Sequence, residues 1–153
     1  VARARGDLDA VFDREARVRA REEPARLVAL LRAAADTTRR LALSSPVDPL
    51  NDLLVHGQDI TRPLGIDHPM SRERVLLVLD TVWSTPMYGA SRRLAGLRFT
   101  ATDADWATGD GPEVRGPVGD LLLIATGRTA GLAALEGPGA PQAVHRFSGA
   151  AAG

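Results

Sequence analysis

The spacing of apolar residues changes once along this chain, and that change limits the folds it can adopt. In the first 94 residues, apolar side chains recur every three or four positions, which is the period of an amphipathic helix. Over 97–102, apolar and polar side chains alternate, which is the period of a half-buried strand. The sequence therefore predicts a mainly α fold, with a helical part over 1–94, a small α+β region over 95–137 and a flexible tail over 138–153.

The best-defined helix is predicted from Asp48 to about Thr61. Asp48 suits the N-cap, Pro49 suits the first helical turn, and Pro63 ends the helix. Gly57 within it predicts the close approach of a neighbouring helix. The predicted core side of this helix is a stripe at helical spacing that comprises Leu50, Leu53, Leu54, Gly57 and Ile60.

Three more helices are expected in the helical part. A strongly charged helix covers about 6–23, and a second begins at Pro24, a residue that suits the first turn. A further helix begins after Ser71, which can cap it, and ends at Pro86. Together with the helix from Asp48, these predict a helical bundle.

The α+β region is predicted to contain one hairpin and two short helices. The strand over 97–102 is expected to pair with 113–115 in an antiparallel arrangement, and Gly109-Asp110-Gly111 is expected to form the hairpin turn. A buried helix is predicted over 117–125, and a second short helix over 129–135.

Composition removes several classes of function. The 153 residues carry 19 basic and 19 acidic side chains, so the net charge of zero argues against a nucleic-acid partner. All the basic residues are Arg, which fits the codon bias of a GC-rich bacterial genome. With no Cys, any thiol chemistry requires a thiol carried by a cofactor. Without a long apolar run or a signal peptide, we expect a cytoplasmic protein with no membrane partner.

The chemistry of the helix from Asp48 centres on Asp52, His56 and Asp59. Spacings of four and three residues place these side chains on one helix face, one turn apart. A carboxylate and an imidazole stacked in this way can supply two ligands to a divalent metal, or can form only a hydrogen-bonded pair. Asp59 is expected either to orient the His56 imidazole or to pair with Arg62 at the helix end.

Other polar groups have simpler structural interpretations. Asp103 and Asp105 resemble an acid–base pair, but carboxylates near a turn more often cap backbone amides. His68 is expected to be exposed in a loop. The Arg pairs at 39–40 and 92–93 could bind a small diacid, but solvated helix ends are the simpler expectation.

Two motifs give the chain a family resemblance. Asp52, His56, Gly57 and Asp59 form an acid-x-x-x-His-Gly-x-Asp pattern. A second run, from Thr102 through Pro117, reads Thr-Asp-x-Asp-Trp and then Gly-x-Gly-Pro-Glu-Val-x-Gly-Pro. Together these motifs resemble the mycothiol-dependent maleylpyruvate isomerase-like proteins, which belong to the DinB-like metal-binding helix-bundle superfamily. The resemblance extends from about Phe12 to Gly137.

The resemblance implies a DinB-like four-helix bundle that binds a divalent metal, most often zinc. It implies that Asp52 and His56 are two of the ligands, that a His on an earlier helix is the third, and that the metal activates the thiol of mycothiol. The expected activity is isomerisation or transfer on a small-molecule substrate, and pairing through exposed helix faces predicts a homodimer.

This sequence departs from the family pattern in two respects. Asp52 stands where the isomerases have Glu, and no His precedes it. Because the chain opens at Val1 in helical sequence, we expect the first helix of the bundle to lie upstream of this sequence. The departures leave an alternative open, in which a non-catalytic DinB-like bundle serves as a dimeric binding or sequestration protein.

Overall fold

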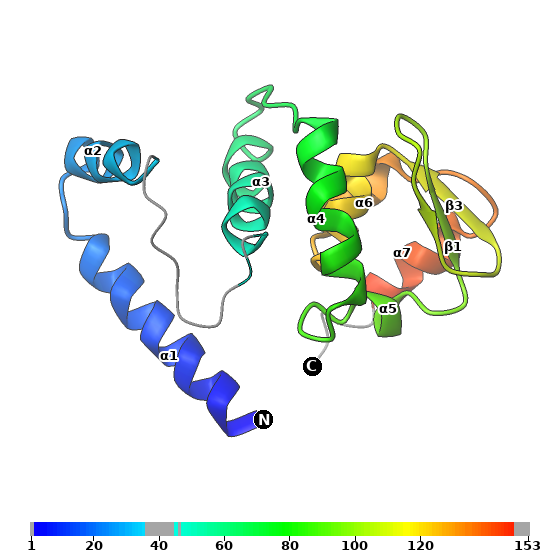
Figure 1. The fold of residues 1–153 in the computed structure, drawn as a ribbon, viewed down its shortest axis with the longest axis horizontal. Coiled ribbons are helices and arrows are strands. Elements are labelled where there is room, and N and C mark those ends of the chain that lie inside the picture. Colours follow the sequence, from blue (N-terminus) through cyan, green and yellow to red (C-terminus); the bar gives the residue numbers. More distant parts are fainter. Residues whose placement is uncertain (1, 36–44, 46, 149–153) are drawn as a thin grey trace. The chain divides into compact units, whose positions relative to one another are not determined.

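The computed structural model describes residues 2–35, 45 and 47–148, and these residues form two compact units divided between Leu41 and Ala42. The first unit contains α1 (Ala2–Arg19) and α2 (Pro24–Ala34) (Figure 1). Pro24 occupies the first turn of α2, as predicted, and α2 has no buried residue. The predicted boundary at residue 94 does not coincide with the division between the two units.

The second unit is built around α6 (Val118–Ala125), whose side chains are buried on all sides. α4 (Arg72–Ser84) packs against α6, and α3 (Asp48–Thr61) packs against α4 (Figure 1). Ser71 caps α4, as predicted, by accepting a hydrogen bond from the Arg74 amide. The remaining helices of the unit are short: α5 (Ala90–Arg93), η1 (Thr129–Ala134) and α7 (Ala140–Ser148).

The sheet contains three short strands, with β1 (Arg98–Ala101) in the centre. β2 (Ala107–Thr108) pairs with β1 in the antiparallel sense, and β3 (Glu113–Gly116) pairs with it in the parallel sense. The predicted antiparallel pairing of 113–115 is therefore wrong, as is the hairpin turn at 109–111. That segment instead carries the chain from one edge of β1 to the other.

Gly109 makes this crossing possible. Its φ of 76° lies in the left-handed region, and a Cβ on it would collide with the backbone carbonyl of Leu97. A side chain at this position would therefore push the crossing segment away from the start of β1. The spacing of apolar residues does not report such a close backbone approach, which is why sequence analysis missed the crossing.

The core of the second unit joins α4 and α6 to the sheet. The Trp83 ring lies 5.0 Å from the Phe99 ring and 5.5 Å from the Trp106 ring, measured between centroids. The Trp106 indole donates a hydrogen bond of 2.7 Å to Asp80 of α4. This tryptophan therefore joins the segment before β2 to α4, and within the second unit the helices and the sheet pack as one body.

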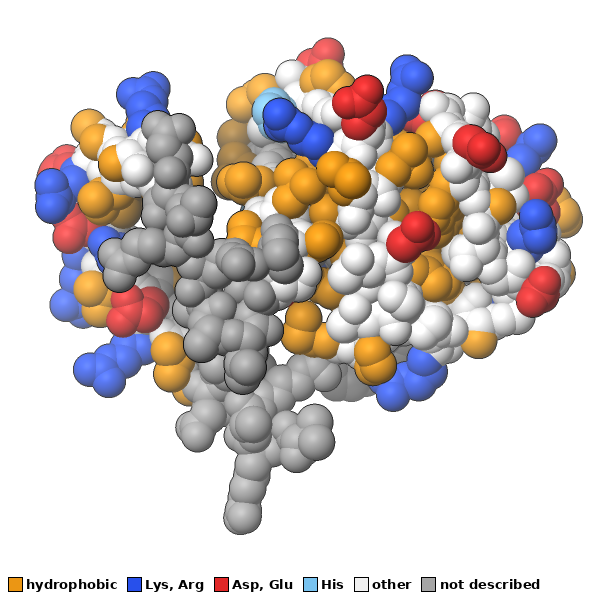
Figure 2. Space-filling model, viewed as in Figure 1, with side chains coloured by type: hydrophobic (Ala, Val, Ile, Leu, Met, Phe, Trp, Pro, Cys, Tyr) orange, Lys and Arg blue, Asp and Glu red, His pale blue; other side chains and the backbone are white. Residues whose placement is uncertain are grey.

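The orientation of α3 agrees with the prediction only in part, since Leu50 and Leu54 of the predicted stripe pack against the core. Its buried residues are Asn51, Val55 and Gln58, whereas Leu53 and Ile60 of the predicted stripe are 65% and 63% exposed. Buried Asn51 and Gln58 are tolerated because the side-chain amide of each donates a hydrogen bond. Figure 2 shows hydrophobic side chains gathered on the exposed surface of the second unit around α3.

Two contacts fix the buried side of α3. The Asn51 amide donates to the Tyr88 hydroxyl at 3.3 Å, and the Gln58 amide donates to the His68 carbonyl at 2.6 Å. Gly57 faces the His68 side chain rather than a neighbouring helix, so the predicted helix approach at Gly57 is wrong. Hydrogen bonds, which apolar spacing does not report, therefore contribute to the rotation of this helix.

The chain end differs from the predicted flexible tail. Residues 140–148 form α7, in which Ala143 and Phe147 are buried. The Arg93 guanidinium lies 5.4 Å from the Phe147 ring centroid, within cation–π range. These contacts hold α7 on the unit, and the predicted tail beyond Ser148 lies outside the described residues. Within the described part of the chain, no helix has both the length and the apolar character needed to cross a membrane.

Candidate functional site

The structure brings His56, Asp59 and Arg128 together. The His56 Nδ1 atom lies 3.0 Å from Asp59 Oδ2, one turn further along α3. Arg128, from the segment between α6 and η1, reaches both oxygens of Asp59, with Nη2 at 3.1 Å from Oδ2 and Nε at 3.4 Å from Oδ1. The forked guanidinium matches the planar carboxylate and fixes its orientation.

The ionisation of Asp59 determines which His56 nitrogen carries the proton. Partial burial alone would raise the pKa of Asp59, but hydrogen bonds and charge from Arg128 and His56 outweigh it and lower that pKa below its ordinary value. An ionised carboxylate can only accept hydrogen bonds, so Nδ1 of a neutral His56 carries the hydrogen. The Nε2 atom then keeps a free lone pair, and no described residue binds it.

Asp52 lies on the same helix but makes no hydrogen bond or ion pair with His56. Its side chain is exposed and has no hydrogen bond or ion pair with any described residue. Burial is the main cause that raises the pKa of the Tyr88 hydroxyl, and the negative charges of Asp48 and Asp52 raise that pKa further. The predicted trio therefore divides into a bonded pair, His56 with Asp59, and a separate carboxylate one turn before it.

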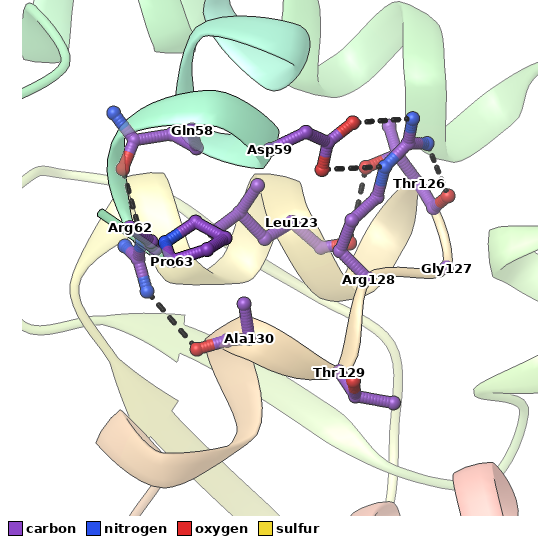
Figure 3. Close-up of a pocket in the computed structure, with 10 residues that line it drawn as sticks. All are labelled: Gln58, Asp59, Arg62, Pro63, Leu123, Thr126, Gly127, Arg128, Thr129 and Ala130. Atoms are coloured by element: carbon purple, nitrogen blue, oxygen red, sulfur yellow. Dashed lines mark hydrogen bonds and ion pairs between the residues drawn. The ribbon is translucent and has the colours of Figure 1, made fainter. Parts of the chain in front are cut away.

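A pocket of about 500 Å³ opens beside the Asp59–Arg128 pair (Figure 3). Asp59 and Arg62 of the α3 end face Arg128 and Ala130 of the segment that follows α6. Leu123 supplies an apolar surface between them. The pocket is large enough for a small molecule and has the guanidinium of Arg128 in its wall.

Arg62 is engaged elsewhere, so the predicted pairing of Asp59 with Arg62 is wrong. Its Nη2 lies 2.8 Å from Oδ1 of buried Asp120, its Nε donates to Gln58 at 2.8 Å, and its Nη1 donates to the Ala130 carbonyl at 3.0 Å. The Asp120 contact is a close ion pair without hydrogen-bond alignment. Arg62 therefore ties α3 to both α6 and η1.

The other polar groups singled out in the sequence have structural contacts or lie elsewhere. Asp103 accepts a hydrogen bond of 2.7 Å from the Val118 amide, which confirms a capping role, and Asp105 is exposed. Arg93 is not a solvated helix end, because it donates to two carbonyls at the end of α6. His68 is exposed, as predicted, and the pair at 39–40 lies outside the described residues.

The described residues contain no group of three or more His, Asp or Glu side chains arranged to hold a metal. Asp52 and His56 could supply two donors, and a tetrahedral zinc site uses at least three protein ligands. The donors present therefore fit part of a metal site.

Sequence analysis did not identify Arg128 as part of this site. It lies 69 residues from Asp59 along the chain, directly after Gly127, and the contact depends on how α3 and α6 each pack against α4. No local pattern could have predicted it.

Comparison of the chain with family models, with curated proteins and with solved structures finds no match. The interpretation of this site therefore depends on its geometry and on the two sequence motifs.

Proposed function

We propose that this chain belongs to a metal-dependent, mycothiol-dependent isomerase or transferase with a DinB-like helix bundle. In this proposal Asp52 and His56 bind a divalent metal, most readily zinc, and Asp59 holds the imidazole of His56. The observation that carries the proposal is the His56–Asp59–Arg128 arrangement. It leaves a ligand nitrogen free on the same helix as an unpaired carboxylate.

The arrangement of His56 matches that of metal-bound histidines in proteins. Such histidines usually donate their second ring N–H to a carboxylate, which fixes the tautomer and the ring orientation. Asp59 makes this contact, and Arg128 fixes Asp59 in turn. The pair thus supports a metal ligand more specifically than an isolated exposed histidine would.

A divalent metal bound at this site would supply Lewis-acid chemistry, which the side chains of the protein do not provide. A divalent metal lowers the pKa of a bound thiol, so that the thiol is a nucleophile near neutral pH without a protein base. The chain has no cysteine of its own, so the thiol must arrive on a cofactor. The residues of the chain bind and orient the reactants.

The pocket beside Arg128 is the natural place for the substrate. Its wall carries the guanidinium, and its floor includes the apolar side chain of Leu123. A small substrate with a carboxylate could approach Arg128 in competition with Asp59, since a guanidinium binds carboxylates in a bidentate manner. We therefore propose a small carboxylic acid as the substrate class.

The first test is the metal content of the purified protein, measured by plasma mass spectrometry. We expect about one divalent ion per chain in the wild type, a common stoichiometry for a zinc site, and its loss in His56→Ala and Asp52→Ala. His145→Ala is the matched control, because His145 is an exposed histidine on α7 with no described partner. It should keep the metal.

Two results would contradict the proposal. One is a wild-type protein that binds no stoichiometric metal even after incubation with zinc. The other is a His56→Ala protein, folded by circular dichroism, that retains the metal. A metal that depends on both residues would justify a screen for turnover of small acids in the presence of a thiol.

One observation favours a second function, that of a non-catalytic dimeric binding protein. Leu53 and Ile60 of α3 are exposed and lie two turns apart on one face, and apolar helix faces of this kind often pair between subunits. We expect sedimentation to detect a dimer that Leu53→Asn with Ile60→Asn disrupts, whereas Val144→Asn on α7 leaves it intact. A monomeric wild type, or turnover of a thiol adduct, would count against this function.

A further inference from the structure

Met70 is a half-buried thioether in the segment 62–71, which joins α3 to α4. It packs against the hydrophobic core and also lines a pocket of about 310 Å³, so small molecules in solution can reach it. The chain has two methionines and no cysteine. Its two thioethers are therefore the side chains at which a mild oxidant would act first.

The side chain of Met70 lies along the first turn of α6. A Cβ atom placed on Gly119 would be 2.7 Å from the Met70 Cε atom and 3.9 Å from its Sδ atom, and the three nearest atoms all belong to Met70. The thioether thus occupies the space that a side chain on Gly119 would take. This close contact between the segment 62–71 and α6 depends on a flexible, uncharged side chain.

The surroundings of this contact suit a thioether better than a sulfoxide. A sulfoxide oxygen carries partial negative charge, and carboxylates line the same pocket. The two arginines that could offset them are already engaged, since Arg62 uses all three guanidinium nitrogens and Arg72 pairs with a carboxylate at 3.4 Å. The carboxylates of the lining are Asp67, Asp103 and Asp120.

Two neutral side chains of the lining, those of Gln58 and His68, hold α3 in place. The Gln58 amide donates a hydrogen bond of 2.6 Å to the His68 carbonyl, and the His68 ring lies 3.8 Å from the position of a Cβ on Gly57. A sulfoxide that accepted a hydrogen bond from either side chain would draw it away from this contact. An oxidised Met70 would therefore loosen α3, whether or not its oxygen found a donor.

We propose that Met70 is a modification site for peroxide, at which oxidation to the sulfoxide releases the segment 62–71 from α6. In this step a sulfur lone pair attacks one oxygen of hydrogen peroxide, an S–O bond forms and the O–O bond breaks. The sulfur loses two electrons, and the peroxide is reduced to water. The proposal needs neither a metal nor a thiol cofactor, so it stands or falls separately from the proposed function.

Two single-methionine variants test the proposal. Met87→Leu leaves Met70 as the sole thioether, and Met70→Leu leaves Met87, which is 57% exposed, as the matched control. Excess hydrogen peroxide should add one oxygen atom to each variant, located by peptide mass spectrometry. The melting temperature of Met87→Leu should then fall by at least about 4 °C, as expected for a lost contact in a domain of this size. That of Met70→Leu should not change.

A second readout locates the change in the structure. In ¹⁵N-labelled Met87→Leu, peroxide should shift the amide signals of Gly119 and His68 and leave that of Ala107 on β2 in place. Methionine sulfoxide reductases should restore both the signals and the melting temperature, because the sulfoxide is reversible. The comparison of Met87→Leu before and after peroxide remains decisive if Met70→Leu does not fold.

Two results would overturn the proposal. The first is a folded Met87→Leu protein in which Met70 stays reduced under conditions that fully oxidise Met87 in the wild type. The second is a Met70 sulfoxide that forms without a change in the melting temperature or in the His68 signal.

Discussion

The Asp59 carboxylate lies between His56 and Arg128, and its Oδ2 atom is 3.0 Å from the His56 Nδ1 atom and 3.1 Å from the Arg128 Nη2 atom. One oxygen therefore links a helix-face histidine to an arginine that follows α6. This link joins α3 to the segment after α6 and orients a ring that would otherwise be free to rotate, since the His56 side chain is 61% exposed.

The first prediction concerns the tautomer of His56. In the wild type at mildly alkaline pH, ¹⁵N shifts of the imidazole should show Nδ1 protonated and Nε2 bare, because ionised Asp59 can only accept a hydrogen bond. Asp59→Ala should return the ring to the tautomer mixture of a free imidazole. Asp52→Ala should not change it, because Asp52 makes no hydrogen bond or ion pair with His56. An equal change in both variants would contradict the arrangement.

The second prediction concerns stability at low pH. Because the pKa of Asp59 is lowered on folding, its ionised contacts stabilise the protein fully above its unfolded value of about 3.8, and that stability is lost as pH falls through the lower folded pKa. Asp59→Ala should lower the free energy of unfolding at neutral pH by at most about 1 kcal/mol, as expected for a partly exposed pair.

Urea denaturation at several pH values measures this effect. The difference between wild type and Asp59→Ala should shrink as pH falls below about 4, where the unfolded carboxylate takes up its proton. Asp105→Ala, at an exposed position without described contacts, is the control and should differ little from the wild type at neutral pH. A difference for Asp59→Ala that stays constant down to the acid limit would show that the ion pair contributes nothing.

The third prediction tests the rotation of α3. Val55 is 2% exposed and Leu53 is 65% exposed. Val55→Ala removes buried methyl groups and should cost about 2 kcal/mol of unfolding free energy, whereas Leu53→Ala should cost less than about 0.5 kcal/mol. Chemical denaturation at low protein concentration measures both. The reverse order would support the apolar stripe that the sequence predicted as the core side.

Local signals in the sequence were sufficient for the ends of several elements. Pro49 and Pro63 bracket α3, Ser71 caps α4, and the change to alternating spacing after residue 96 marks β1. Each signal acts within a few residues, because a missing N–H or a side-chain cap affects only its own turn. Local signals of this kind can be recognised in the sequence without knowledge of the fold.

Tertiary contacts determined what the sequence could not show. α3 buries Asn51 and Gln58 because the two side chains donate hydrogen bonds to the Tyr88 hydroxyl and the His68 carbonyl. Polar residues therefore occupy positions that apolar spacing assigns to solvent. In the site, spacing on one helix correctly suggested that Asp59 could orient His56. It could not place Arg128, because that contact exists only once α6 packs in place.

The last prediction concerns the Arg62–Asp120 ion pair, the most buried ion pair among the described residues. Asp120→Ala should cost about 3 kcal/mol of unfolding free energy, because it leaves a guanidinium without its charge partner. Arg62→Ala should cost at least as much, since it leaves the buried carboxylate unpaired and also removes the donors to Gln58 and Ala130. The double variant should cost less than the sum of the two, with a coupling of about 1–2 kcal/mol.

The surface pair Arg115–Glu136 is the matched control for this cycle. Its side chains are 48% and 60% exposed, so its coupling should lie below about 1 kcal/mol. Denaturation of the four proteins in each cycle provides both values under the same conditions. If Arg62 and Asp120 couple no more strongly than the surface pair, the junction of α3 with α6 must be held by apolar contacts rather than by this ion pair.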